Sequence, residues 1–438
     1  MLPSTPDAGW GRTDARHVTP VERDDLGNYL VNLRSGRLEL NTLYGDEHGD
    51  FSKDASNKPI LDPHDPAQMI VPRWSTSWVD RPSLARHLGG DPRDCSNLII
   101  QQLRLALILL HNRIARACDV QSIRACGRER VFEWARRELR HVYQWLVVND
   151  LVRRLCGSAM VDEVMQANAP LYRGFLDSLG GGIQPCVPVE FFAAAFRFGH
   201  SMVRSSYDCN SVLGRPGQDA RNVLRSAPLG LLLKDHDQFS DFLSGDPIDL
   251  EETFRIDWSR LTGLPSADYP DRSTRKIDSR ISAAMAEPTA NWEGLGVGRA
   301  HLARRNLRRG YQLNLTSGQA AVAETNRRLG TRIEPLSQQE LCSGPTGSTM
   351  RSGSLTEHTP LWFYILKEAE IRGEGERLGP LGARLVAETI VGLVVADPTS
   401  YWHRGGSVHR RWHPSCNARL LGATVTSFAD LLRSAEAS

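Results

Sequence analysis

Apolar residues at helical spacing dominate the middle and the end of the chain. Residues 97–118 are apolar around most of the helix surface, which predicts a central helix. Residues 128–155 carry Glu and Arg on one side and Val, Trp and Leu on the other, and Gly157 is expected to end this second helix. Period-two alternation, which marks half-buried strands, is nearly absent. Further helices are expected at residues 188–204, 276–286, 297–309, 359–369, 381–395 and 427–435.

The remaining segments are polar and rich in turn-forming residues. Residues 1–60 contain one extended, strand-like stretch, RLELNTLYG, at 37–45. Residues 210–275 are expected to form loops and short helices. These patterns predict a mainly α fold with little β structure, in which residues 1–438 form a single large domain with an irregular tail at 403–438.

Composition narrows the class of protein without naming a function. Of the 438 residues, 40% are hydrophobic and 24% charged, which is typical of a globular chain. The formal net charge of +2 gives no reason to expect nucleic acid as a partner. No apolar signal segment opens the chain, and polar residues interrupt the run at 98–118, so we expect no membrane span and a cytoplasmic protein. The eight cysteines form no close pair, unlike a disulfide framework or a zinc ribbon.

The segment VEFFAAAFRFGHSMVRSS carries the sharpest chemical signal. Phe192, Phe196 and His200 recur at i, i+4 and i+8, which predicts that they share one face of a helix. On this pattern alone, a core histidine is favoured over a ligand. Arg197 and Arg204 flank His200, and a buried arginine needs an anion that the helix itself does not supply.

The run AAAFRFGHSMV resembles the proximal helix of animal-type haem peroxidases, in which an Arg-aromatic-Gly-His run ends in the axial ligand of the iron. Four more segments resemble the same family in the same order, over roughly residues 10–402. They are GGDPRDCSNLIIQQLRLALILLHNRIA for the distal helix, RVFEWARRELRHVYQWLVVNDLVRRLCG for the next helix, HLARRNLRRGYQLNLTSGQ for the Asn-x-x-Arg-Gly element and GARLVAETIVGLVVADPTSYW for the closing helix.

This resemblance implies a set of roles around a haem b. His200 would ligate the iron, and Asn306 would accept the proton on the other ring nitrogen. Arg197 and Arg309 would bind the haem propionates. Arg93 would stand on the opposite, distal side and stabilise the charge that develops as the peroxide O–O bond breaks.

The distal acid–base residue departs from the family pattern. Family members carry this His in a Trp-Gly-Gln-x-x-Asp-His-Asp-x-Thr-like stretch, for which GWGRTDARHVT is the candidate. Arg16 stands at the His position, His17 follows it, and an arginine stays protonated and cannot act as a base. Three alternatives remain: His17 is recruited by a local shift, the distal site is altered and its activity weak or repurposed, or the recorded start or reading frame is wrong. Residues 1–30 are therefore interpreted as a degenerate distal arm.

Other family features also change in this sequence. Glu39 and Asn41 stand where the calcium loop of the family has Asp and Ser, and Ala15 replaces its Asp partner, so calcium is not expected. Ser96 replaces the Glu that mammalian members esterify to the haem, so no covalent link is expected. The cyclooxygenase and fatty-acid dioxygenase branch has a radical-forming Tyr at the position of Arg197, which favours the peroxidase branch here.

A second group of possible metal ligands lies near the end of the chain. His403, His409, His413 and Cys416 are residue types that hold zinc, but their spacing matches no standard site. A solvated basic loop is favoured over a zinc site. His111, in LLHNRIA, is expected to be structural.

The sequence thus predicts a haem-dependent, peroxidase-like oxidoreductase whose partners are hydrogen peroxide and a small organic donor. The alternative is a non-catalytic or repurposed haem-binding protein that has lost the distal histidine. A third possibility is a helical scaffold without haem, in which Phe192, Phe196 and His200 belong to the core.

Overall fold

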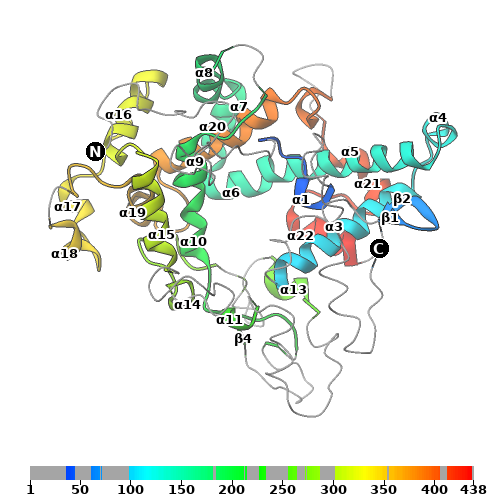
Figure 1. Cartoon of the computed structure of the whole chain (residues 1–438), viewed down its shortest axis with the longest axis horizontal. Coiled ribbons are helices and arrows are strands. Elements are labelled where there is room, and N and C mark those ends of the chain that lie inside the picture. The colour runs from blue at the N-terminus through cyan, green and yellow to red at the C-terminus, as the bar shows by residue number, and fades with distance from the viewer. Residues whose placement is uncertain are drawn as a thin grey trace, which may run out of the picture.

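A computed structural model describes most of the chain, and helices supply nearly all of its regular structure (Figure 1). This confirms the predicted mainly α fold. His17, Arg93 and Ser96 lie outside the described residues. The described ranges are 36–44, 61–69, 71, 98–180, 184–211, 213–214, 226–232, 255–263, 272, 274–286, 301–352, 355–404 and 412–436.

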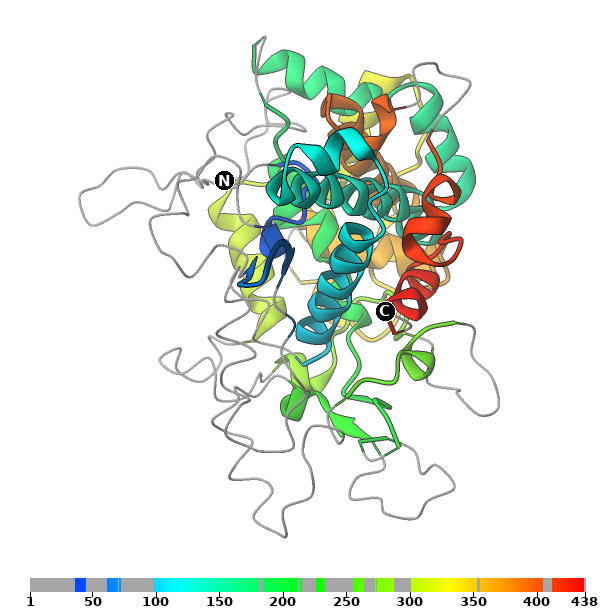
Figure 2. The same cartoon turned by 90° about the vertical axis from the view of Figure 1, so that its right-hand side faces the viewer.

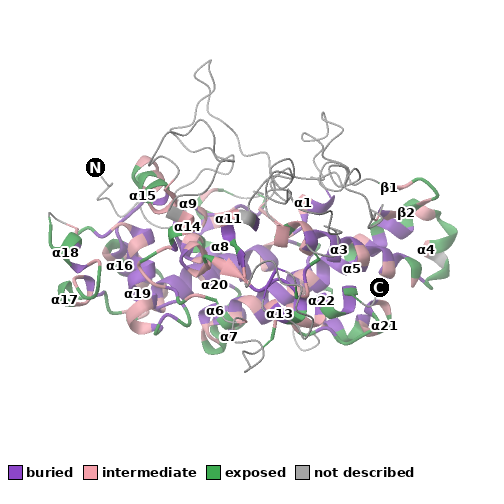
Figure 3. Cartoon of the chain, turned by 90° about the horizontal axis from the view of Figure 1, so that it is seen from below, coloured by how far each residue is buried: buried purple, intermediate pink, exposed green. Residues whose placement is uncertain are grey.

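One apolar helix, α20 (Pro380–Ala396), lies at the centre of the fold and is buried over residues 381–394 (Figures 1 and 3). Apolar residues stand on most sides of it, and its charged residues Arg384 and Glu388 are buried with them, so no face of it is left to water. Gly392 lets a neighbouring helix approach closely, because a Cβ there would lie 2.3 Å from the ring of Tyr172. The helices packed against α20 include α7 (Ser158–Gln166), α8 (Pro170–Ser178), α9 (Val189–Ala193) and α19 (Leu361–Arg372).

The helix predicted at residues 128–155 is confirmed as one continuous helical segment. It begins as α5 (Arg128–Leu146), passes through the π-helical turn η6 (Val147–Val152) and ends as α6 (Arg153–Cys156). Gly157 follows with φ of +83°, a backbone conformation that glycine adopts without strain, which confirms it as the stop.

The helix predicted at residues 97–118 is also confirmed, as α3 (Leu98–Arg116), which packs against α5. The C-terminal helices α21 (Ala418–Leu421) and α22 (Phe428–Glu436) lie against α3 (Figure 2). By length and composition α3 is the one described helix that could cross a membrane, and 56% of its apolar window is buried inside the protein.

Several other helices match the prediction, and several do not appear in it. α15 (Leu302–Gln312), α19, α20 and α22 form close to the expected positions. The short α11 (Leu229–Leu232) and α13 (Trp258–Leu261) fit the prediction for residues 210–275. The sequence analysis missed further helices: α4 (Gln121–Ala125), α7, α8, α16 (Gly318–Leu329), α17 (Gln338–Leu341), α18 (Gly347–Met350) and α21.

The strand-like interpretation of RLELNTLYG is wrong. Residues 41–44 form the short helix α1 (Asn41–Tyr44), entered through Leu40 at φ of +58°. Leu40, Leu43 and Tyr44 are buried, and this i, i+3, i+4 spacing belongs to a helix turn. The strands of the described ranges form two short antiparallel pairs, β1 (Leu61–Asp62) with β2 (Asp65–Met69), and β3 (Ser206–Tyr207) with β4 (Ala227–Pro228).

The helix predicted at residues 276–286 is largely wrong as well, because only α14 (Ala283–Ala286) forms. Upstream, the Asp278 carboxylate accepts the backbone N–H of Arg280, and such local side-chain bonds compete with a helix. Ile277 donates its N–H to the carbonyl of Gly375 instead of to its own segment.

Two buried glutamates cap helices that start elsewhere in the fold. Glu368 on α19 accepts the backbone N–H groups of Leu381 and Gly382 at the start of α20, at 3.0 and 3.1 Å. Glu388 on α20 accepts those of Leu171 and Tyr172 at the start of α8, at 2.9 and 3.3 Å. These bonds satisfy N–H groups that a helix cannot pair within itself.

Burial raises the pKa of Glu368 and of Glu388 from 4.5 to about 7, against the lowering effect of the backbone N–H groups. The folded state therefore binds more protons than the unfolded state between pH 4.5 and about 7, and the free energy of unfolding should fall as the pH rises through this window. We expect Glu388→Gln, which keeps an acceptor oxygen, to flatten this fall by about 1–3 kcal/mol.

Urea unfolding at pH 4.5, 5.5, 6.5 and 7.5 measures this slope. Glu357→Gln, at an exposed position, is the matched control and should keep the slope of the wild type. Parallel slopes for Glu388→Gln and the wild type would contradict the prediction.

Candidate functional site

The segment that carries His200 folds as three short pieces instead of the predicted single helix. α9 ends at Ala194, whose φ and ψ of −135° and −68° leave the helical region, and the 3₁₀ turn η7 (Ala195–Phe198) and α10 (Gly199–Met202) follow. The break rotates Phe196 outward, where it is 42% exposed and stacks on Phe191 with ring centroids 4.8 Å apart. Phe192, Phe196 and His200 therefore do not share one face, since the predicted i+4 spacing fails across the 3₁₀ turn.

His200 meets Asn306, which lies 106 residues later on α15. The Nδ1 atom of His200 is 2.8 Å from Nδ2 of Asn306, the only residue of α15 that is buried. Oδ1 of Asn306 accepts a hydrogen bond from Nη1 of Arg197 at 2.9 Å. The structure thus joins three residues that the sequence analysis selected, in the order His200, Asn306, Arg197.

The orientation of the Asn306 amide differs from the expected one. The resemblance implies that Asn306 accepts a proton from the ring, whereas here its amide nitrogen faces the ring. The reason is the second contact, because a guanidinium can only donate and therefore takes the amide oxygen. Turning the amide over exchanges the two roles without moving the backbone.

The His200 imidazole is uncharged at neutral pH. Burial lowers its pKa to about 4, and the nearby charges of Arg197 and Arg305 lower it further. Its Nε2 atom makes no hydrogen bond to the part of the chain that the structure describes. A neutral ring with one nitrogen held and the other available is the form in which histidine binds a metal.

Arg197 and Arg305 place positive charge near the His200 ring. The pKa of Arg197 is lowered by burial, and after that by the charges of Arg309 and Arg305 on α15. Arg197 donates to the carbonyl of Phe192 at 2.8 Å and to Asn306, and neither partner carries a negative charge. The cluster formed by Arg197, Arg305 and Arg309 is therefore a place where carboxylate groups of a ligand would be stabilised.

Two residues of this region escaped the sequence analysis. Arg305 directly precedes Asn306 in the run ARRNLRRG, and this density of arginine was the available signal. Trp362 on α19 is buried and donates its indole N–H to the carbonyl of Arg197 at 3.1 Å. Within the apolar run LWFYIL nothing distinguishes this Trp from ordinary core, so no sequence signal could have found it.

The other selected residues divide into two groups. His17 and Arg93 lie outside the described residues, so their positions stay predictions. His111 is structural as predicted, because it is fully buried between the Tyr44 hydroxyl at 2.9 Å and the Ala67 carbonyl at 3.2 Å.

The C-terminal histidines have separate local partners. His403 bonds to the carbonyl of Val395, and His413 accepts the N–H of Ser415. Within the described residues, no three His, Cys, Asp or Glu side chains gather as a metal site. His409 lies outside these residues.

Comparison with known proteins gives one family and one fold. The family model described as animal haem peroxidase matches residues 28–229, which include Arg93 and His200 but not His17 or Asn306. Heme peroxidase 2 of Caenorhabditis elegans is 28% identical over 127 residues, which are 29% of this chain and 17% of that protein. The aligned segment therefore spans less than a fifth of this curated relative.

Solved structures extend the likeness of fold over most of the chain. Peroxidase A from Dictyostelium discoideum superposes with a TM-score of 0.59 at 16% identity, over 93% of this chain and 71% of that one. The fatty acid alpha-dioxygenase of Oryza sativa gives a TM-score of 0.54 at 15% identity, over 86% and 61%. At this level of identity the superpositions show a shared fold.

The geometry around His200 predicts how its pKa responds to charge. Arg305→Ala removes a nearby positive charge and should raise the pKa of His200, because the protonated ring is then repelled less. Arg308→Ala, at an exposed position of the same helix, is the matched control. NMR titration of the His200 ring protons in the protein without added cofactor measures both, and an equal pKa in the two variants would contradict the assigned cluster.

Proposed function

The chain belongs to the animal haem peroxidase superfamily, and from this premise we propose that it is a haem-dependent oxidoreductase that uses hydrogen peroxide to oxidise a small organic donor. The observation that carries the proposal is the contact chain from His200 through Asn306 to Arg197. It places a neutral imidazole, an amide that fixes the ring and a guanidinium in one connected group. A plain core histidine would not need this arrangement.

The residues of this site fit a haem. A haem iron takes a single axial histidine from the protein, and His200 is a neutral histidine with its Nε2 available. The propionates of a haem are carboxylates, and the Arg197–Arg305–Arg309 cluster would stabilise them. We assign Arg197 and Arg309 to the propionates, with Arg305 as a third charge beside them. Ser96 offers no carboxyl group for an ester link, which supports a non-covalent haem b.

The bound haem would supply the redox chemistry with peroxide, and the chain would supply the axial ligand and its control. A ring that binds through Nε2 carries its proton on Nδ1 and needs an acceptor there. Asn306 provides one when its amide is turned over. Arg197 then loses the amide oxygen as its acceptor, and a propionate oxygen would replace it. In this proposal, the state of the axial ring and the binding of a propionate are coupled through one amide.

Two features of the chain bear on the type of reaction. Arg197 occupies the place where the dioxygenase branch has its radical-forming Tyr, which supports the peroxidase branch. We assign charge stabilisation on the distal side to Arg93, and proton transfer to His17. Arg16 at the family's His position is the observation that favours the second candidate function, a haem-binding protein without peroxidase turnover.

Loss of the axial ligand should abolish specific haem binding. We expect haemin to bind the wild-type protein at one to one, with the Soret band of a histidine-ligated haem, and His200→Ala to lose that band. His64→Ala, in the exposed turn between β1 and β2, is the matched control and should titrate like the wild type. A folded wild-type protein without a saturable Soret change would refute the haem proposal and favour a scaffold without haem.

Peroxide turnover separates the two candidate functions. In the peroxidase proposal, the haemin-loaded wild type oxidises a phenolic donor such as guaiacol, and Arg93→Ala lowers kcat/KM for peroxide by about 10²–10³-fold. His17→Ala should lower it as well, with the Soret band of both variants unchanged. Haem binding with no turnover above that of free haemin would instead establish the haem-binding protein.

A further inference from the structure

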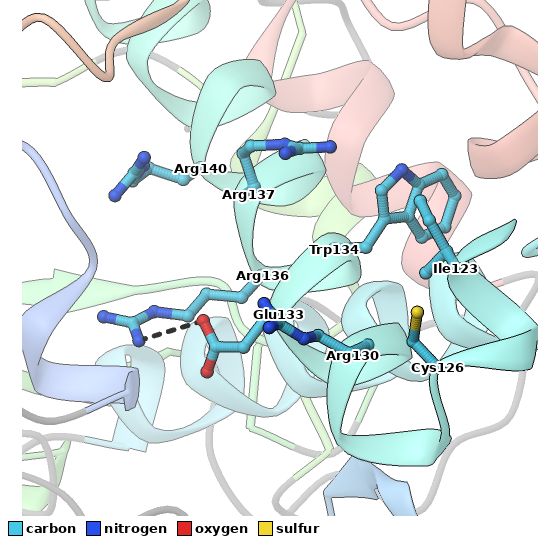
Figure 4. Close-up of a pocket in the computed structure, with 8 residues that line it drawn as sticks. All are labelled: Ile123, Cys126, Arg130, Glu133, Trp134, Arg136, Arg137 and Arg140. Carbon is cyan, nitrogen blue, oxygen red and sulfur yellow. Dashed lines mark ion pairs between the residues drawn. The ribbon is translucent and has the colours of Figure 1, made fainter.

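A basic hollow of about 400 Å³ lies beside α4 and the first turns of α5, across the molecule from α10 and α15 (Figures 1 and 4). Its described lining includes four arginines, Arg130, Arg136, Arg137 and Arg140, and a single carboxylate, Glu133. Steps of three and four residues place these side chains along one stripe of α5. This stripe lies on a different helix from the residues of the His200 cluster.

Two carboxylates of the described residues lie near these arginines, and both have particular partners. Glu133 lies 3.5 Å from Nη1 of Arg136. Glu138 is buried and accepts both terminal nitrogens of Arg404, at 2.5 and 2.8 Å, so Arg137 reaches it only at 3.8 Å.

Two of the four guanidinium groups are therefore open to a ligand. Arg130 and Arg137 are exposed, one on each side of the Glu133 turn. Arg130 forms no ion pair within the described part of the chain. Arg140 is more than nine-tenths buried, donates to the carbonyl of Thr399 at 3.2 Å and adds a fixed positive charge at the rear.

The opposite wall of the hollow is apolar. Trp134 is buried on α5, and Ile123 comes from α4, which turns back over α5 at Gly127. Gly127 has φ of +97°, which a residue with a side chain would adopt only under strain. An apolar wall beside charged donors, in a volume of this size, has room for a small organic ligand that carries an anionic group.

We infer that this hollow binds a small organic oxyanion with an aromatic or branched apolar body. Its carboxylate, sulfonate or phosphate head group meets the planar guanidinium forks of Arg130 and Arg137, which bind such groups through paired hydrogen bonds. The body packs on Trp134 and Ile123. The inference rests on α4 and α5 alone and does not depend on haem binding.

Isothermal titration of the full chain with naphthalene-2-sulfonate tests the site. We expect saturable one-to-one binding that weakens as salt is raised. Arg137→Ala and Arg130→Ala should each weaken it about tenfold or more, as expected for a lost hydrogen bond between charged groups. Arg137→Lys keeps the charge without the fork and should fall between the wild type and Arg137→Ala.

Arg124→Ala is the matched control, because Arg124 is exposed on α4 but does not line the hollow. Circular dichroism of each variant establishes that it is folded. No saturable binding by the wild type, or equal binding by the Arg137→Ala and Arg124→Ala variants, would overturn the assignment.

A titration in the presence of haemin distinguishes this site from the Arg197 cluster. If the sulfonate occupies the α5 hollow, the Soret band and the haemin affinity stay unchanged. Competition between the sulfonate and haemin would place the anion at the Arg197 cluster and overturn the inference, whereas a failure of haemin to bind would leave the α5 site intact.

Discussion

The burial of α20 is the constraint from which much of the architecture follows. A helix that is apolar over most of its surface must be enclosed by others, and those others must reach it closely. The small residues Ala193, Ala194 and Ala195 are fully buried in the segment that packs against α20 and α19. This close packing accompanies the break at Ala194, and the break sets the direction in which Arg197 and His200 leave the backbone.

The burial of α20 also explains why two glutamates lie inside the protein. α20 begins and α8 begins inside the protein, where unpaired N–H groups are costly. Glu368 and Glu388 meet that need from neighbouring helices. Burial removes both carboxylates from water, and this desolvation raises the pKa of each.

At the candidate functional site, a neutral amide stands beside the histidine ring, where many metal sites have a carboxylate. Asn306 is fully buried and holds both the His200 ring and the Arg197 guanidinium. A carboxylate at this point would neutralise Arg197 and make the ring more electron-rich. An amide leaves the positive charge of Arg197 in place, and this charge is what an anionic edge of a ligand would meet.

The strongest periodic segments were predictable, and the junctions between them were not. Long apolar patterns of helical spacing run through α3, α5, α19 and α20, and few structures other than a helix fit such patterns. α7, α8 and α16 are short, and their burial depends on α20 and α19, so their own sequences carry little signal. The stretch at 37–45 was predicted wrongly because it is also short. Its buried residues span a single helix turn, and one turn is too short to show a helical period.

The residues of the candidate site were likewise predictable only in part. The helix pattern singled out His200 and Arg197, but their roles and their link to Asn306 came from a resemblance between motifs, since neither spacing nor composition connects residues more than 100 positions apart. Trp362 could not be found, because its contribution is a single hydrogen bond to the carbonyl of Arg197.

The contrast between the two arginine clusters extends this argument. Both stand in a chain whose basic residues are mostly arginine, so the number of arginines alone distinguishes neither. What distinguishes them is their partners. Arg197 donates to neutral oxygens beside a neutral imidazole, whereas the α5 arginines stand near carboxylates that other groups already hold. Arg197 is fixed before any ligand arrives, and this reduces the entropy that binding must overcome. On α5 only Arg140 is held in this way, whereas Arg130 and Arg137 are exposed and would lose side-chain entropy on binding.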